Sequence, residues 1–317
     1  MSDLNPQKLF NFPVPLEEVE IYHDEAYGRK NCPFYHQFLI VPLRSKAILN
    51  QALQQKRTEL KADPFTINWK KLRKETASRN LTAEQWLYLL NRGMRAQSFS
   101  YIFQRMPQCF QTDLGIKIGT FAGNLSDSFW AHLPSEEERT RRKYETLLRM
   151  GIKGCLHYCF NPEFTCYGGV KIKRFYTDAH VFGKVSLDNE RILGRLEAGL
   201  RNYIRLEENI KIEHVEKSEN KTPEVNLEEL TDLALGSTRY IYTDYGKSGW
   251  LDRIVAPLDE VYRKKERGKS FKNSSHFRSF TLGICETDKN DNLSFRQWKL
   301  PSSETSIEQY NGKLNLK

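Results

Sequence analysis

The sequence predicts an α/β protein, in which strand patterns and amphipathic helical patterns follow one another. Two stretches carry this prediction, at 19–26 and 173–180, because each has a tyrosine two positions before an aspartate. In a strand, that spacing puts tyrosine and aspartate on one face, while the apolar residue between them points to the other face. The third observation is a helical pattern at 227–236 that also carries acids. A buried carboxylate needs a partner or a metal, so the three stretches together point to one acidic site.

The bulk composition indicates one large domain with an ordinary core. The chain has 317 residues, of which 39% are hydrophobic and 28% are charged, as is usual for a globular protein. No apolar run is long enough to cross a bilayer, residues 1–15 do not resemble a signal peptide, and six cysteines are too few for a disulfide framework. We therefore expect a cytoplasmic protein without a membrane partner. The net charge of +9 favours a polyanionic partner such as nucleic acid.

In the first half of the chain, strand and helix patterns follow one another. After the first strand and a turn, a second strand at 34–43 is predicted to form a hairpin with the first. A helix with Ser45 as its N-terminal cap follows, and then a third strand at 65–69. Thr82 opens a capping-box pattern for the next helix, and the alternation at 115–123 indicates another strand.

The clearest helix of the sequence begins after Ser135. This residue is a good N-terminal cap, acids occupy the first turn, and the apolar residues that follow are spaced three and four apart. The same spacing bears on a zinc site built from Cys155, His157, Cys159 and Cys166. It places Cys155 and Cys159 in the buried stripe while His157 points elsewhere, so core packing is the favoured interpretation.

In the second half, the acidic strand at 173–180 is followed by a helix capped near Ser186 or Asp188 and by a strand at 209–215. Asn226 is predicted to cap the next helix. On that helix Glu229, Asp232 and Gly236 share one face, which we expect to line a cleft; a solvent-exposed face is the alternative.

The remaining pattern completes a single domain. A helix at 250–265 is predicted to break near Pro257, and 280–285 with 293–300 indicates a hairpin. We expect one domain over 1–300, with a helical insertion around 70–160 and a polar tail at 301–317.

The order of these elements resembles the ribonuclease H-like fold: an acidic first strand, an antiparallel neighbour, a helical excursion, a second acidic strand and an acidic late helix. The resemblance implies a mixed β-sheet flanked by helices. More closely, the chain is similar to an uncharacterised family of that fold, domain of unknown function 3800. Members open with Asp-Glu-Ser-Gly after a strand and close with Leu-Gln-x-Ala-Asp-x-x-Ala-Gly on a helix. Asp24, Glu25, Asp232 and Gly236 match, whereas Ala26 and Glu229 replace the family's Ser and Gln, and Glu216-Lys217-Ser218 matches its Asp-Ser-Lys only loosely.

The resemblance implies a metal-dependent nuclease. It assigns Asp24, Asp178 and Asp232 as ligands of Mg²⁺ or Mn²⁺, with Glu25 and Glu216 as further catalytic candidates. Two such ions would activate water and stabilise the leaving oxygen of a phosphodiester. A role in bacterial defence against foreign nucleic acid is a further implication of the family. His180, two residues after Asp178, would orient water or a phosphate, or be a structural residue.

A basic run with interleaved aromatic residues is the candidate nucleic-acid interface. Its cations would contact phosphates and its phenylalanine would stack on a base; a solvated helix end is the alternative. The run comprises Arg263, Lys264, Lys265, Arg267, Lys269, Phe271 and Lys272. A non-catalytic protein that binds nucleic acid or assembles complexes on the same fold is the alternative function, and strand transfer would need the same acids. The sequence leaves DNA or RNA, protein partners and a homo-oligomer open.

Overall fold

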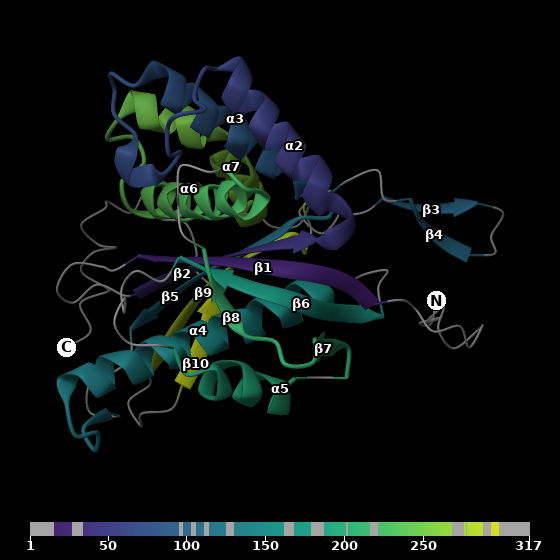
Figure 1. The fold of residues 1–317 in the computed structure, drawn as a ribbon, viewed down its shortest axis with the longest axis vertical. Helices are drawn as coiled ribbons and strands as arrows, with labels where there is room; N and C mark the ends of the chain where they lie inside the picture. Colours follow the sequence, from purple (N-terminus) through teal and green to yellow (C-terminus); the bar gives the residue numbers. More distant parts are fainter. Residues whose placement is uncertain are drawn as a thin grey trace.

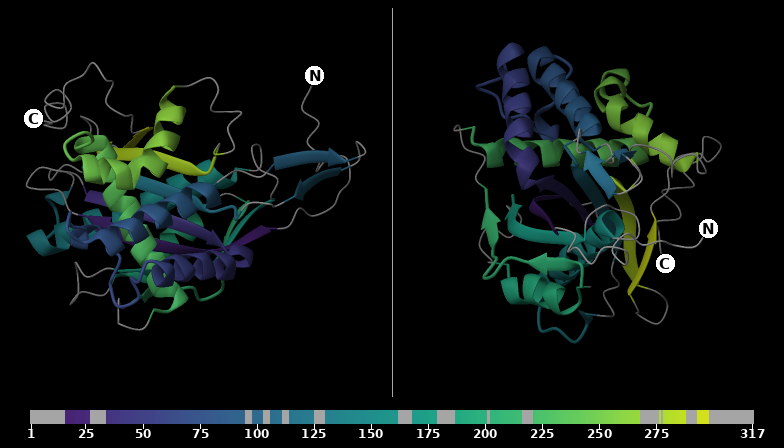
Figure 2. Two further views of the ribbon diagram at one scale, coloured as in Figure 1. Left: turned by 90° about the horizontal axis from the view of Figure 1, so that it is seen from above. Right: turned by 90° about the vertical axis from the view of Figure 1, so that its right-hand side faces the viewer.

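The computed structural model describes residues 16–26, 34–94, 98–102, 106–110, 114–124, 130–161, 168–178, 187–200, 202–215, 221–267, 276, 278–287 and 293–297. Within these residues the protein is α/β, with a mixed sheet that curls between two layers of helices (Figures 1 and 2). The fold class predicted from the sequence is confirmed at this level.

The main sheet has the strand order β10-β9-β5-β2-β1-β6-β7, and β8 also pairs with β6. β1 is antiparallel to β2 and parallel to β6, and β6 is parallel to both β7 and β8. On the other side, β2 is antiparallel to β5, β5 is parallel to β9, and β9 is antiparallel to β10. The strands are β1 (Leu16–Ala26), β2 (Phe34–Pro42), β5 (Lys117–Asn124), β6 (Gly169–Thr177), β7 (Ile204–Leu206), β8 (Ile212–His214), β9 (Phe280–Thr287) and β10 (Leu293–Gln297).

Both faces of the sheet are covered (Figure 1). One face carries α2 (Leu43–Glu59), α3 (Ala77–Gly93), α6 (Pro223–Thr243) and α7 (Gly249–Glu266), and the other carries α4 (Glu136–Phe160), η3 (Glu190–Gly194) and α5 (Arg195–Ala198). A separate hairpin, β3 (Ser98–Ile102) and β4 (Met106–Phe110), lies to one side of the sheet. None of the helices in the described part of the chain has the length and apolar character needed to cross a membrane.

Strand β1 shows why both faces must be covered. Tyr22 belongs to the core under α2, α3, α6 and α7, whereas its neighbour Ile21 belongs to the core under α4. Alternate side chains of a strand point to opposite faces, so a strand between two helical layers is apolar on both. β1 is accordingly buried almost continuously from Val19 to Asp24.

Several predictions from local patterns are confirmed. The Ser135 side chain accepts a hydrogen bond from the backbone N–H of Glu138 and caps α4, and Cys155 and Cys159 lie in its buried stripe. The strands predicted at 34–43 and 115–123 correspond to β2 and β5, and the C-terminal hairpin to β9 and β10. β5 lies in the segment predicted as a helical insertion and is an integral strand of the sheet.

Other local predictions are wrong. Residues 65–69 form no strand; they lead into the short 3₁₀ helix η1 (Trp69–Lys71). Ser45 lies inside α2, where its hydroxyl donates to the Leu114 carbonyl, and Thr82 lies inside α3, where its hydroxyl donates to the Ser78 carbonyl. Both helices therefore begin before the predicted caps.

α6 also begins before its predicted cap, and α7 lacks the break predicted at Pro257. Thr222 caps α6 with Pro223 in the first turn, so Asn226 is a buried residue within the helix. α7 continues through Pro257 without a break, and the Pro257 carbonyl accepts a hydrogen bond from the Asn91 side chain at 2.5 Å. A carbonyl of this helix is therefore satisfied by a neighbouring helix.

Candidate active site

Three parallel strands of the sheet end at one edge. The register aligns His23 of β1 with Thr177 of β6, and Thr177 with His214 of β8. The backbone N–H of Asp178 donates to the His23 carbonyl at 3.2 Å, and the N–H of Val215 donates to the Thr177 carbonyl at 3.1 Å. The chain therefore brings Asp24 and Asp178, predicted from separate stretches, to adjacent positions where β1 and β6 end.

Asp24 and Asp178 lie on the face of the sheet that α6 covers. The rings of Tyr22 and Tyr176, two residues before each aspartate, stack with 5.0 Å between centroids in the core beneath this helix. Because strand residues two apart share a face, each aspartate lies on the same face as the tyrosine two residues before it. Asp24 is buried and its Oδ1 accepts the Glu25 N–H at 2.8 Å, whereas Asp178 is half-buried.

Glu25 belongs to the opposite face. Its Oε2 accepts a hydrogen bond from the Tyr144 hydroxyl of α4 at 3.3 Å and lies 3.9 Å from Nδ1 of His23. The sheet thus separates this carboxylate from those of Asp24 and Asp178. In this arrangement Glu25 joins β1 to α4, and it is not part of one carboxylate cluster with the two aspartates.

Two buried histidines lie under the same edge, on the Glu25 side. His23 Nε2 and His36 Nδ1 are 2.9 Å apart, and His23 Nδ1 is 2.9 Å from the Thr177 hydroxyl. Burial lowers the pKa of His36 to about 3, and burial together with the neighbouring His36 holds the pKa of His23 well below its usual value. Both imidazoles are therefore neutral near pH 7, and they connect β1 with β2 and β6.

Asp232, the predicted third ligand, accepts a hydrogen bond from the protein backbone. Its Oδ2 accepts the backbone N–H of Trp69 at 2.5 Å, at the start of η1. One turn later on α6, Gly236 leaves the space that the Trp69 ring fills, because a Cβ at that glycine would lie 2.1 Å from Trp69 Cγ. The acid and the glycine that share this helix face thus hold a tryptophan, and the predicted cleft is filled.

The described residues contain no cluster of three histidine, cysteine, aspartate or glutamate side chains that could hold one metal ion. Glu216 and His180 lie outside the described residues; Val215, just before Glu216, is hydrogen-bonded at the same edge. The structure therefore brings Asp24 and Asp178 to adjacent strand ends, places Glu25 on the opposite face, and engages Asp232 with the Trp69 backbone.

Sequence reasoning missed the buried acid Glu228 on α6. It lies one turn after Glu224, whose Oε1 is 2.7 Å from the ammonium of Lys46, and Lys46 is also 2.7 Å from Glu20 of β1. Helical spacing therefore turns Glu228 toward the sheet as well, and its side chain is wholly buried. The available signal was the Glu228-Glu229 pair inside an apolar helix, where Glu229 in turn forms a buried ion pair with Arg57 of α2.

The described part of the basic run is largely committed to contacts within the protein. Arg263 pairs with Asp259 at 2.7 Å and Lys264 with Glu260 at 2.5 Å. Lys265 lies over the rings of Phe280 and Tyr158, and burial lowers its pKa to about 8. Arg267 is exposed at the end of α7, and Lys269, Phe271 and Lys272 lie outside the described residues.

The sheet edge that carries Asp24 and Asp178 is the candidate site that the chain assembles from distant segments. Neither the comparison with models of known protein families nor the comparison with curated proteins gives a match for this chain.

Proposed function

We propose that this protein is a metal-dependent nuclease of ribonuclease H-like fold, related to the uncharacterised family that its motifs resemble. The proposal rests on one observation: Asp24 and Asp178 follow two adjacent parallel strands and lie at the same edge, joined by the hydrogen bond from Asp178 N–H to the His23 carbonyl. Two segments about 150 residues apart thus end side by side, each with an aspartate at its end. Two unrelated loop aspartates would have no reason to lie at adjacent strand ends.

The surrounding order of elements supports the same reading. The first strand is paired with an antiparallel second strand and a parallel later strand, and a late helix, α6, crosses the face on which both aspartates lie. This is the layout that the resemblance implies. The basic charge of the chain is suited to a polyanionic substrate.

Asp24 and Asp178 fit a divalent cation by their chemistry and place. Mg²⁺ and Mn²⁺ prefer carboxylate oxygens, and two carboxylates at one position favour a cation because they otherwise repel each other. When bound there, the ions would supply an activated water and charge stabilisation for phosphodiester hydrolysis. The residues of this chain would hold them from β1 and β6, and the neutral His23–His36 pair would keep the end of β1 in register.

A second candidate function, nucleic-acid binding without turnover, is favoured by a specific observation. Asp232 accepts the Trp69 N–H, and the described residues provide only the two aspartates at the edge. A protein with this arrangement would keep the fold and the positive net charge without cutting. The role of Asp232 therefore distinguishes the two candidates.

The test is cleavage of labelled single- and double-stranded DNA and RNA with Mg²⁺ or Mn²⁺. Asp24→Asn and Asp178→Asn are expected to lose cutting while keeping the circular dichroism spectrum of the parent chain, and Asp63→Asn, at an exposed carboxylate in a loop, should keep cutting. Asp232→Asn retains an oxygen that can accept the Trp69 N–H, so loss of cutting in this variant would make Asp232 a ligand as well. No cutting of any substrate by the parent chain, with salt-sensitive binding unchanged in Asp24→Asn, would establish the binding function instead.

A further inference from the structure

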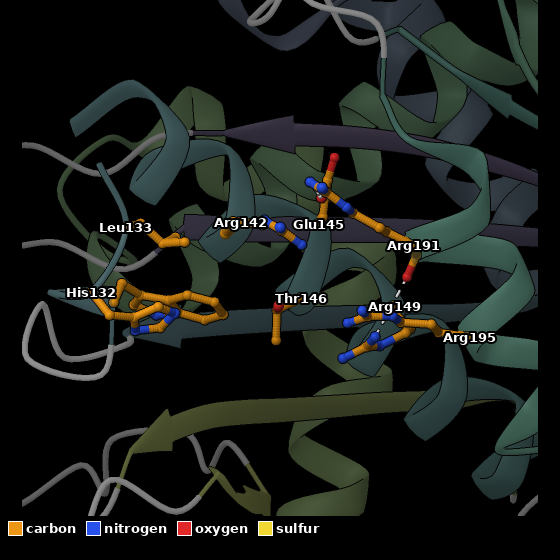
Figure 3. A pocket seen from close by; sticks show the side chains of 9 residues that line it. His132, Leu133, Arg142, Glu145, Thr146, Arg149, Arg191 and Arg195 are labelled. Atoms are coloured by element: carbon orange, nitrogen blue, oxygen red, sulfur yellow. Dashed lines mark hydrogen bonds and ion pairs between the residues drawn. The ribbon is translucent and has the colours of Figure 1, made fainter. Parts of the chain in front are cut away.

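A second polar site lies on the α4 face of the sheet. A pocket of about 350 Å³ is formed between α4 and the segment η3–α5. Four arginines line it: Arg142 and Arg149 from α4, Arg191 from η3 and Arg195 from α5. Figure 3 shows the side chains of Arg149 and Arg195 close together at one end of the pocket, with His132 at the other end and Thr146 between them. Four guanidinium groups around one cavity make it a candidate anion site.

The arginines differ in how their charge is balanced. Arg142 pairs with Glu138 at 2.9 Å, and Arg191 pairs with Asp188 at 2.9 Å. Within the described part of the chain, no ion pair joins Arg149 or Arg195 to an acid. Among the described residues, Arg149 donates to the backbone carbonyl of Arg191, at 3.4 Å. Two positive groups at the same end of the pocket are therefore not held in an ion pair with an acid of the described chain.

The two groups also affect each other. Burial lowers the pKa of the Arg149 guanidinium, and the neighbouring positive charge of Arg195 lowers it further. Holding like charges together in a partly dry pocket costs free energy, which a bound anion would remove. The pocket acid, Glu145, offsets part of this effect on Arg149, but its carboxylate also accepts the Asp188 N–H at 3.3 Å and lies 3.8 Å from Arg191.

A terminal phosphate has the chemistry to fill this end of the pocket. A phosphomonoester carries between one and two negative charges at neutral pH, and its oxygens match the paired N–H donors of guanidinium groups. Trp130 and Leu133 form an apolar wall of the same pocket, beside His132. A flat ring attached to the phosphate would therefore meet aromatic and apolar surface.

We propose that this pocket binds a terminal phosphate joined to a nucleoside, with Arg149 and Arg195 as the groups that bind the phosphate. Free mononucleotides and the phosphorylated end of a strand share this chemistry. The pocket lies on the α4 face of the sheet, where Tyr144, the residue before Glu145, donates to Glu25 at the end of β1. This is the opposite face from Asp24 and Asp178, so the proposal does not depend on cleavage there.

The experiment compares matched probes on the full chain. Fluorescence anisotropy would measure binding of a labelled oligonucleotide with a 5′-phosphate or with a 5′-hydroxyl, and calorimetry would measure adenosine 5′-monophosphate against adenosine. We expect the phosphorylated member of at least one pair to bind about tenfold more tightly, a preference that Arg149→Gln with Arg195→Gln should abolish. Arg253→Gln, at an arginine on α7 far from the pocket lining, is the matched control and should keep the preference.

The possible results distinguish a free nucleotide from a strand end as the source of the phosphate, and both from a result that overturns the proposal. A gain for the mononucleotide alone indicates a free nucleotide site, a gain for the oligonucleotide alone indicates a strand end, and equal gains indicate a site that accepts both. Equal binding of phosphorylated and unphosphorylated probes, or a preference that survives in the double variant with its circular dichroism unchanged, would overturn the proposal. Because Asp24→Asn leaves this pocket intact, phosphate binding that persists in that variant separates this site from the proposed nuclease.

Discussion

The buried ion pair between Arg57 of α2 and Glu229 of α6 joins two helices of the layer above the sheet, and its removal should have a large effect. Neither side chain is exposed to solvent. Arg57 also donates to the Phe65 carbonyl at 2.6 Å and to the Asn226 side chain at 3.0 Å, and Glu229 accepts from Lys221 at 2.9 Å. Replacing Glu229 by leucine would leave a guanidinium charge buried with neutral acceptors only.

The expected loss of stability follows from this arrangement. Removing one partner of a buried pair costs about 3–5 kcal/mol, because the remaining charge is uncompensated. We expect Glu229→Leu to lie near the lower limit, about 3 kcal/mol, because Arg57 keeps two neutral hydrogen bonds. That is a large part of the roughly 5–15 kcal/mol that stabilises a typical domain. Arg57→Met should cost a similar amount, because it leaves the Glu229 carboxylate buried with Lys221 as its one cationic partner in the described chain.

Urea unfolding of the single variants and the double variant, Arg57→Met with Glu229→Leu, tests this reasoning. Tryptophan fluorescence is a suitable signal, because the Arg57 guanidinium lies 4.8 Å from the Trp86 ring centroid. The double variant should lose much less stability than the sum of the single variants, since neither the Arg57 nor the Glu229 charge remains buried without its partner. Glu59→Gln, in the exposed pair with Lys56, is the control and should leave the midpoint unchanged. Additive losses would refute the argument that the penalty arises from the unpaired charge.

Two further predictions concern close packing and pH. Gly236→Ala should destabilise the protein by about 1–3 kcal/mol, because the new methyl group overlaps the Trp69 ring; thermal unfolding should show no such loss for Gly249→Ala, which has open space, and equal losses would contradict the packing argument. The neutral His23–His36 pair should make the protein less stable as the pH falls below about 6.5, the pKa of histidine in the unfolded chain. The loss should continue toward the folded-state pKa of His36, about 3. At pH 5, protonation of His36 in the unfolded chain lowers the free energy of unfolding by about 2 kcal/mol. Urea unfolding of His36→Gln should therefore show a smaller loss of stability between pH 7 and 5 than the parent chain. An equal loss in this variant would exclude His36 as the source.

The sequence predicted the parts of the fold that depend on local chemistry. Ser135 followed by three glutamates caps α4 as expected, and the alternation of the two acidic stretches identifies β1 and β6. Both signals lie within a few residues, so no knowledge of distant neighbours is needed. The meeting of Asp24 and Asp178 was implied by the family resemblance and not by local chemistry, because the parallel pairing of β1 with β6 joins distant segments.

The failures have a common cause in tertiary contacts. Asn226 is a good capping residue, yet its side chain is needed inside α6 to hydrogen-bond with Arg57 and Asn50. Residues 65–69 alternate like a strand, but the backbone of Trp69 is held by Asp232, 163 residues away in the chain. The contact of Asp232 with Trp69 was also beyond the sequence, because a helical position reveals the face of an acid but not the distant backbone group that it binds.

The parallel pairing of β5 with β9 has a consequence for how the chain is made. Ile118 lies opposite Phe280, so half of the chain separates these partners. During synthesis, β5 is finished long before β9 emerges from the ribosome, and contacts between such distant segments form slowly. Until then the outer edge of β5 offers unpaired backbone groups to other strands. The nascent protein therefore has an open strand edge at β5, through which it can associate with other chains, until residues 280–287 are translated.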